Sequence, residues 1–263
     1  MGYNGLPSPL HGDAVRYILP LAGEGVRFQG YSDKPKYLID VMGQPMISHG
    51  IAGLQCKPEE IVVVVQKEHN EKFNVGKQIK MVLGKKVIVV EVGRTCGATE
   101  TVLLGIENGG VAAEELICVK DADCISIPKP NWRKKVEQGA AENDEMAWVS
   151  TYNDQGPPAG GLTNKSHVRL EDKSVIEIQE KIRLSPFFIA GYYIFSKTKL
   201  FIEIARQVVK EQKESPTTKE AYLSNVMSRI MKKGKPVQNF EIQEYADLGT
   251  PEALRDYVKQ FRA

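Results

Sequence analysis

The chain has 263 residues, 42% of them hydrophobic, and its 35 basic side chains nearly balance 33 acidic ones for a net charge of +2. This composition predicts a packed globular protein with one large α/β domain or two small ones, and the near-neutral charge argues against binding of nucleic acid or of a membrane surface. The four cysteines form no CxxC pair and no apolar stretch approaches the roughly 18 residues of a membrane span, so we expect a cytoplasmic protein.

Residues 1–14 are rich in glycine, proline and asparagine and lack the apolar block of a signal peptide. We therefore expect a loose N-terminal leader, 1–14, followed by a single folded domain, 15–263. The residue pattern changes at about residue 144, which divides this domain into the halves 15–143 and 144–263.

Short β-branched runs alternate with helix-like segments along the chain. The expected strands are 17–21, 61–65, 87–90, 116–119, 146–151 and 189–195, with a hairpin at 167–179. The expected helices are 45–55, 68–83, 98–107, 129–141, 197–211, 219–233 and 251–261. This alternation predicts an α/β fold, a Rossmann-like three-layer sandwich with a mixed, mostly parallel central sheet that binds ligands at the carboxyl ends of its strands.

The first expected strand runs into a glycine-rich turn that is followed by an arginine and a lysine. Gly23 and Gly25 have no side chain, so backbone N–H groups there can approach an anion closely. Arg27 and Lys36 could then contact the phosphates. The stretch is not a Walker loop, because no Gly-Lys-Ser/Thr follows. An ordinary tight turn is the alternative interpretation.

Two acidic segments stand far apart in the sequence. Asp121 and Asp123 follow the apolar run 116–119, and their spacing of two places both side chains on one face of an extended chain. Paired carboxylates suit Mg²⁺, which takes one or two of them together with substrate phosphates. Asp247 begins the segment Asp-Leu-Gly-Thr-Pro, in which Thr250 fits the N-cap of the last helix. An acidic turn and a simple helix cap are the alternatives.

Two further segments carry candidate binding residues. The loop 93–100 precedes an expected helix, so its glycines and N–H groups face the same edge of the sheet. The run Glu-Ile-Gln-Glu-Lys ends in Glu180 and Lys181, shortly before an expected strand. A solvated charge pair on a strand is the alternative interpretation of these last two residues.

The order GxGxRF at 23–28 and PKxLIDVxGxPMI at 35–47 resembles the opening of the sugar-1-phosphate nucleotidyltransferases, also called nucleotide-sugar pyrophosphorylases. The resemblance is to their compact single-domain type and covers roughly residues 16–260. It implies a GT-A-like nucleotidyltransferase fold, in which 15–143 binds the nucleotide and 144–263 binds the acceptor.

The resemblance also implies roles for individual residues. Those expected to be catalytic are Arg27, Lys36, Asp123, Lys181 and Asp247, of which Asp123 and Asp247 would bind Mg²⁺, with Mn²⁺ as an alternative. Those expected to bind the nucleotide are Leu21, Ala22, Gly23, Glu24, Gly25, Gly97, Ala98 and Asp121. Those expected to bind the acceptor are Gly161, Glu180, Lys181 and Gly191. Relatives often carry glutamine near the base-reading loop, where this chain has Thr95, Thr99 and Glu100, so the base stays open.

The activity implied is transfer of a nucleoside monophosphate from a nucleoside triphosphate to a phosphorylated acceptor, with a sugar 1-phosphate as the first choice and pyrophosphate as the product. Three alternatives stay open: a CTP-dependent cytidylyltransferase for a non-sugar phosphorylated metabolite, a DxD-type glycosyltransferase, and a catalytically silent nucleotide-sugar-binding regulator. We expect no nucleic-acid or membrane partner. The sequence leaves the acceptor, the pathway and a homo-oligomeric state open.

Overall fold

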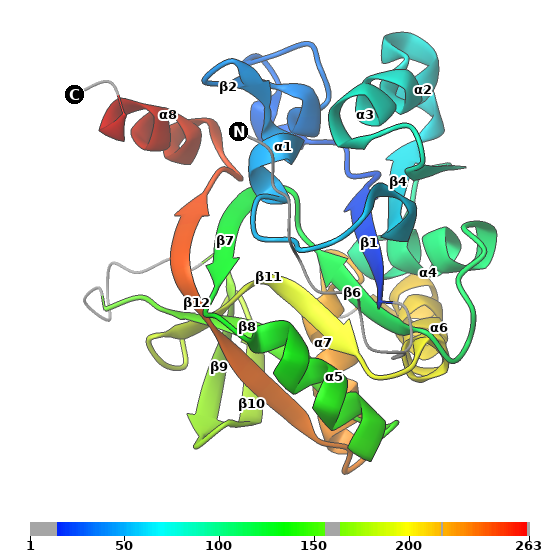
Figure 1. Ribbon diagram of the computed structural model, residues 1–263, viewed down its shortest axis with the longest axis vertical. Helices are drawn as coiled ribbons and strands as arrows, with labels where there is room; N and C mark the ends of the chain where they lie inside the picture. Colours follow the sequence, from blue (N-terminus) through cyan, green and yellow to red (C-terminus); the bar gives the residue numbers. More distant parts are fainter. Residues whose placement is uncertain (1–14, 156–163, 217, 262–263) are drawn as a thin grey trace.

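The computed structural model describes residues 15–155, 164–216 and 218–261, and within them the strands form a ten-stranded sheet and a separate two-stranded one (Figure 1). The strands are β1 (Val15–Leu21), β2 (Asp40–Val41), β3 (Gln44–Pro45), β4 (Ile61–Gln66), β5 (Ile88–Val92), β6 (Leu116–Lys120), β7 (Cys124–Pro128), β8 (Ala147–Asn153), β9 (Ser166–Glu171), β10 (Ser174–Glu180), β11 (Phe187–Phe195) and β12 (Val237–Asp247). The helices are α1 (Met46–Gly50), α2 (Lys67–Phe73), α3 (Val75–Leu83), α4 (Ala98–Asn108), α5 (Trp132–Glu142), α6 (Thr198–Glu214), α7 (Leu223–Lys232) and α8 (Pro251–Gln260), with short 3-10 turns η1 (Val26–Phe28), η2 (Lys36–Leu38) and η3 (Pro58–Glu60).

The large sheet is mixed, with its parallel part in the first half of the chain. Strands β5, β4, β1 and β6 lie side by side in parallel, and Tyr17 of β1 stands opposite both Ile61 and Cys118. Strand β11 then pairs antiparallel with β6 and β8, β12 joins β8 in parallel, and the hairpin β10–β9 completes the order. The expected α/β class with a mixed central sheet is confirmed. The expectation that this sheet is mostly parallel is wrong, because β11 reverses direction and, within the described residues, β7, β9 and β10 pair only antiparallel.

Helices cover both faces of this sheet, as a three-layer sandwich requires. Val62 and Val64 of β4 belong to the core that α4, α6 and α7 cover. Val63 and Val65 belong to the opposite core, which α3 and α5 cover. In Figure 1, α5 crosses in front of the sheet while α6 and α7 lie behind it. This double burial explains why β4 is a continuous apolar run rather than an alternating one.

Three of the expected helices differ clearly from the structure, and one of these, 219–233, begins only at Leu223 of α7. The expected helix 68–83 is divided into α2 and α3 at Asn74, whose backbone is left-handed with φ 51°. Asparagine tolerates this conformation at a helix end. The expected helix 45–55 contains only α1, which ends at Gly50, because glycine is a poor helix former. None of the helices in the described part of the chain is long and apolar enough to cross a membrane.

A small third core joins segments from the two ends of the chain. Leu248, just before α8, and Leu254 within it are buried together with Phe28, Ile39 and Met46. This contact holds the segment that follows the glycine turn next to the segment that contains Asp247. Two motifs more than 200 residues apart thereby face the same edge of the large sheet.

Candidate active site

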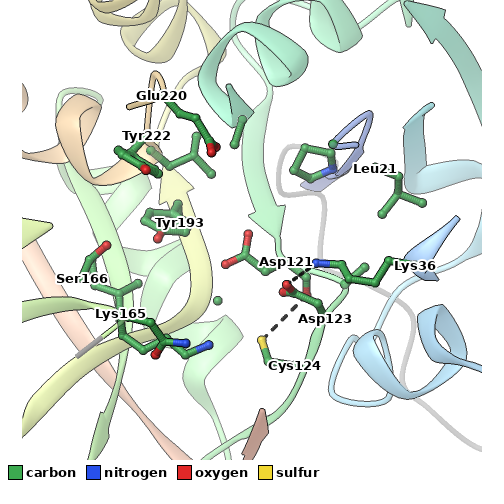
Figure 2. A pocket seen from close by; sticks show the side chains of 18 of the residues that line it. Leu21, Lys36, Asp121, Asp123, Cys124, Lys165, Ser166, Tyr193, Glu220 and Tyr222 are labelled. Atoms are coloured by element: carbon green, nitrogen blue, oxygen red, sulfur yellow. Dashed lines mark hydrogen bonds and ion pairs between the residues drawn. The ribbon is translucent and has the colours of Figure 1, made fainter. Parts of the chain in front are cut away.

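The carboxyl ends of the parallel strands open onto two adjoining cavities, of about 310 and about 540 Å³. Of the predicted site residues, the first cavity is lined by Leu21, Gly23, Gly25, Arg27, Lys36, Ala98, Asp121, Asp123, Glu180, Lys181 and Gly191. The second cavity adds Ala22, Glu24 and Gly97, and it shares the glycine turn, Arg27, Lys36 and Lys181 with the first. Predicted residues from both halves of the chain therefore meet around one space (Figure 2), although Asp247 itself lines neither cavity.

The glycine turn connects β1 to η1 and directs two cations toward this space. Gly25 has a left-handed backbone, with φ 64°, and a Cβ there would lie 3.6 Å from the Cβ of Lys36. A side chain at this position would be strained, which explains the requirement for glycine. Arg27 is exposed at the rim of both cavities. Arg27 and Lys36 therefore place two cations beside the glycine turn.

The acidic pair lies on the floor of the first cavity, directly after β6. Lys36 Nζ donates a 2.6 Å hydrogen bond to Asp123 Oδ2. Burial and the neighbouring Asp123 carboxylate raise the pKa of Asp121 to about 6. Burial alone would also raise the pKa of Asp123, but the ammonium groups of Lys36 and Lys165 outweigh it and hold that pKa below its usual range. Asp123 is therefore the stronger acid of the pair.

Asp247 comes to the same place because β12 pairs with β7, which follows the acidic pair. The Leu248 N–H donates a 2.9 Å hydrogen bond to the Asp123 carbonyl. A Cβ at Gly249 would lie 3.0 Å from Asp247 Oδ1 and 3.2 Å from Asp123 Oδ2. The two carboxylates therefore reach the same glycine. The expected cap is also present, since Thr250 Oγ1 accepts a 3.2 Å hydrogen bond from an N–H in the first turn of α8.

Lys120, the last residue of β6, was not predicted from the sequence to belong to the site. Its side chain is fully buried, and Nζ donates to the Asp121 carbonyl and, at 3.2 Å, to the Cys124 carbonyl. Nζ also lies 5.0 Å from the centre of the Tyr192 ring. Lys120 therefore stabilises the acidic turn, residues 121–124, through two hydrogen bonds from the buried side of the strand. The position of a lysine at the end of an apolar strand was the feature of the sequence that could have identified it.

Lys165 was missed as well, although it lies in the centre of the site. Its Nζ is 3.0 Å from Asp247 Oδ1, and 18% of the Lys165 side chain and 9% of the Asp247 side chain are exposed. Burial would lower the pKa of Lys165, but the carboxylates of Asp247 and Asp123 outweigh it and raise that pKa. No motif surrounds this residue in the sequence, so only the fold identifies it.

Glu180 and Lys181, which are expected to bind the acceptor, both have partners within the chain. Glu180 Oε2 accepts hydrogen bonds from Ser166 Oγ and, at 2.7 Å, from Ser224 Oγ. Lys181 Nζ lies 2.5 Å from the Tyr222 hydroxyl oxygen and 4.3 Å from the centre of its ring. Lys181 also has a left-handed backbone, with φ 58°. Non-glycine residues in this conformation are uncommon and concentrate at functional sites.

Gly191 lines the first cavity for a reason of close packing. Its backbone is left-handed, with φ 87°, and a Cβ there would lie 2.6 Å from Cys124 Sγ and 3.4 Å from the Asp121 Cβ. Its carbonyl accepts a 2.9 Å hydrogen bond from the Asp121 N–H. Gly191 therefore supports the acidic turn. The other expected acceptor glycine, Gly161, and the expected leader 1–14 lie outside the described residues.

In the loop 93–100, the polar side chain of Glu100 serves the loop's own structure. Glu100 accepts a 2.6 Å hydrogen bond from the Cys96 N–H and forms an ion pair with Lys213 of α6. Thr99 is fully buried, and neither residue lines a cavity. Thr95 does line the second cavity. Of the three polar residues expected there, only Thr95 therefore faces the space where a ligand would bind.

Gln66, at the end of β4, was not singled out in the sequence. It lines the second cavity and is only 3% exposed. Its Nε2 is buried without a hydrogen-bond partner among the described residues. A buried amide without a partner is costly unless a ligand supplies one.

One family model and several curated proteins match the chain. The family model described as IspD, 2-C-methyl-D-erythritol 4-phosphate cytidylyltransferase, matches residues 15–151. The chain is 26% identical over 251 residues to the bifunctional protein GlmU of Mycobacterium leprae (strain Br4923), a match that covers 89% of this chain and 46% of that protein. The chain thus spans about half the length of the curated relatives it matches.

Solved structures with the same fold cover nearly the whole chain. The nucleoside-diphosphate-sugar pyrophosphorylase from Vibrio cholerae RC9 has a TM-score of 0.74 at 21% identity, over 93% of this chain and 100% of that one. The inositol-1-phosphate CTP transferase from T. maritima has a TM-score of 0.63 at 16% identity, over 95% and 97%. These likenesses confirm the expected nucleotidyltransferase fold.

Proposed function

The chain belongs to the nucleotidyltransferase family of the IspD model, and on that premise we propose that it transfers a nucleoside monophosphate from a nucleoside triphosphate to a phosphorylated acceptor, releasing pyrophosphate. The observation that carries the proposal is the convergence of Asp123, Asp247 and Lys36 from three distant segments. A cation beside two carboxylates suits phosphoryl chemistry, in which alignment and charge neutralisation do most of the work.

Asp123 and Asp247 would hold Mg²⁺, with Mn²⁺ as an alternative. Two carboxylates that reach the same glycine offer the hard oxygen ligands that Mg²⁺ prefers. Among the described residues no group of three or more His, Cys, Asp or Glu side chains could hold a metal alone, so substrate phosphates and water would complete the shell. When bound, such an ion neutralises charge on the phosphate oxygens.

The chain's own residues would supply the alignment. Arg27 and Lys36 hold the outer phosphates, which leave as pyrophosphate, and Lys181 places the acceptor phosphate for in-line attack on the α-phosphorus. An acceptor oxygen forms the new bond to that phosphorus while the bond to the pyrophosphate oxygen breaks. A phosphate monoester has a second pKa of about 6 and is largely dianionic at neutral pH, so no protein base has to remove a proton.

The nucleobase would occupy the second cavity, next to the glycine turn. Gln66 and Thr95 supply polar groups there, and the unpartnered Gln66 Nε2 suits a carbonyl oxygen on the base. The acceptor would lie in the first cavity, where Ser166 and Glu220 can hydrogen-bond hydroxyl groups.

Two acceptor classes are proposed in order. The first is a sugar 1-phosphate. The second is a non-sugar phosphorylated metabolite with CTP as donor, which is favoured by the match of a cytidylyltransferase model to residues 15–151 and by the likeness to the inositol-1-phosphate CTP transferase.

A panel assay tests the proposal. Purified protein with Mg²⁺ is given ATP, CTP, GTP, UTP or dTTP together with sugar 1-phosphates or phosphorylated alcohols, and pyrophosphate is measured by a coupled assay. Release that requires both substrates and stops with EDTA supports the proposal. Release of a nucleoside diphosphate from a nucleotide sugar identifies a glycosyltransferase instead, and nucleotide-sugar binding without turnover identifies a silent regulator.

A further inference from the structure

Each of the two carboxylates proposed to bind the metal is paired with a lysine, and the two lysines come from opposite halves of the chain. Lys36, on the nucleotide side, lies 2.6 Å from Asp123 Oδ2, and Lys165, on the acceptor side, lies 3.0 Å from Asp247 Oδ1. Figure 2 shows Lys36 and Lys165 reaching toward the acidic pair from opposite sides. Each proposed metal ligand therefore has one lysine partner.

This arrangement keeps the site electrically balanced without a metal. The Asp247 side chain is only 9% exposed, and a buried carboxylate without a partner is strongly destabilising. Lys165 supplies the charged partner, beside the Gly249 N–H that also donates a 3.0 Å hydrogen bond to Asp247 Oδ1. A divalent ion that bound alone would displace or oppose two ammonium groups, which would then lack partners of their own. Metal binding should consequently be weak until phosphates are present to accept the lysines.

We propose that Lys165 is a further catalytic residue that exchanges Asp247 for the phosphate of the acceptor when the metal binds. The inference rests on the proposed nucleotidyl transfer. In this exchange each ion pair would be replaced rather than lost, because Asp247 would hold the metal while the Lys165 ammonium pairs with a phosphate oxygen of the acceptor. Lys36 makes the matching exchange on the triphosphate side.

The position of Lys165 assigns it to the acceptor. It directly precedes Ser166 of β9, whose hydroxyl donates to Glu180. Its carbonyl accepts a 3.1 Å hydrogen bond from the Lys181 N–H. Its Nζ also lies 5.6 Å from the centre of the Tyr245 ring, so the side chain is held over the cavity. Lys165 and Lys181 thus form a backbone-linked pair of cations beside the acceptor side of the cavity.

The exchange makes metal and phosphate binding mutually dependent. A phosphate monoester that draws Lys165 away should tighten metal binding, and by linkage the metal should tighten phosphate binding by the same factor. Removal of the Lys165 charge should break this dependence, because the metal no longer competes with an ammonium group for Asp247.

Metal binding to the intact chain tests the exchange without any knowledge of the natural substrates. Mn²⁺ alone is titrated by electron paramagnetic resonance into wild type, Lys165→Gln and Lys165→Arg, with and without methyl phosphate as a monoester probe. We expect Lys165→Gln to bind Mn²⁺ at least about fivefold more tightly than wild type and Lys165→Arg to bind it as weakly as wild type. Methyl phosphate should tighten Mn²⁺ binding in wild type and leave Lys165→Gln unchanged.

The control is Lys129→Gln, which removes an exposed lysine paired with Glu241 outside the two cavities and should leave Mn²⁺ binding unchanged. Equal Mn²⁺ affinity in wild type and Lys165→Gln would overturn the inference even if the enzyme is active. If Lys165→Gln binds Mn²⁺ more tightly but the wild-type protein releases no pyrophosphate from any substrate pair, the exchange stands and the proposed function is rejected. Should Lys165→Gln not fold, Lys165→Met is titrated in its place.

Discussion

The Nζ of Lys36 lies 2.6 Å from Oδ2 of Asp123, although 87 residues separate the two in the chain. Both side chains are about one quarter to one third exposed, so the pair contributes little to folding, on the order of 0–1 kcal/mol. This contact matters for its position, because it presents a cation beside the carboxylate of the acidic pair that has the lower pKa.

Replacing Asp123 with asparagine should therefore abolish catalysis and spare the fold. The amide keeps the shape but removes the negative charge that would hold Mg²⁺, and we expect kcat to fall at least about a hundredfold, as when other preorganised electrostatic groups are lost. The apparent Tm should change little. Steady-state pyrophosphate release and thermal denaturation measure the two effects.

Asp256→Asn provides the matched control for this variant, because Asp256 is an exposed aspartate of α8 paired with Lys259. It should be fully active. An Asp123→Asn protein with wild-type turnover would remove Asp123 from the proposed metal site.

Lys120→Met should weaken both the fold and the activity. The change leaves the Asp121 and Cys124 carbonyls without the buried donor that they share, and unsatisfied buried acceptors cost about 1–3 kcal/mol. The acidic turn should then shift, and misplacement of about 1 Å can cost about a hundredfold in rate. Urea denaturation followed by circular dichroism gives the free energy of unfolding. Lys129→Met, an exposed lysine, is the comparison, and equal stability of the two variants would contradict the role given to Lys120.

The sequence predicted those parts of the site that lie in local motifs. Gly23 and Gly25 are recognisable because a strand runs directly into them, and Asp121 and Asp123 because they end a β-branched run. The alternation of strands and helices was enough for the layers of the fold, since apolar periodicity is set by burial on one or two faces. In each of these cases, the residues of one short segment were enough for the prediction.

Contacts between distant segments could not be predicted in the same way. Lys165 and Asp247 are 82 residues apart, and nothing in the sequence around Lys165 distinguishes it from a surface lysine. The structural use of Glu100 was hidden for the same reason, because its partner Lys213 lies on another helix. The break at Asn74 depends on a single left-handed residue, which a helical pattern of side chains does not register.

The four cysteines should react slowly with iodoacetamide in the folded protein. Burial raises the pKa of Cys56 to about 12 and, together with Glu100, that of Cys96 to about 11, and burial also raises the pKa of Cys118 and Cys124. A raised thiol pKa means less thiolate at any given pH, and the thiolate is the reactive form. At pH 8 we expect labelling at least about tenfold slower than in urea, where an ordinary thiol pKa of about 8.5 applies.

The same shifts predict how stability depends on pH. The thiols of the unfolded chain lose their protons at lower pH than those of the folded protein. Their contribution to the free energy of unfolding should therefore be constant below about pH 8.5 and should fall as the pH rises toward the pKa values of the folded thiols. Mass spectrometry of labelled peptides at pH 8 and pH 10 should show Cys96 reacting before the buried Cys118. Fast labelling of Cys118 at pH 8 would show that the closed core opens readily.

Gln66 should decide which base the second cavity accepts. Gln66 lines that cavity, and its Nε2 is buried without a partner among the described residues, so we expect a base bound there to accept its hydrogen bond. Gln66→Glu keeps the shape but replaces the donor with an acceptor, and sites built to hydrogen-bond a ligand discriminate strongly when a partner is lost. We expect kcat/KM for the preferred triphosphate to fall at least about tenfold, which corresponds to about 1.4 kcal/mol, and the ranking of the triphosphates to change. Gln78→Glu, on α3 and away from both cavities, serves as the control. An unchanged ranking in Gln66→Glu would place the base elsewhere, because a residue that only packs under the cavity would lower the rate with all triphosphates equally.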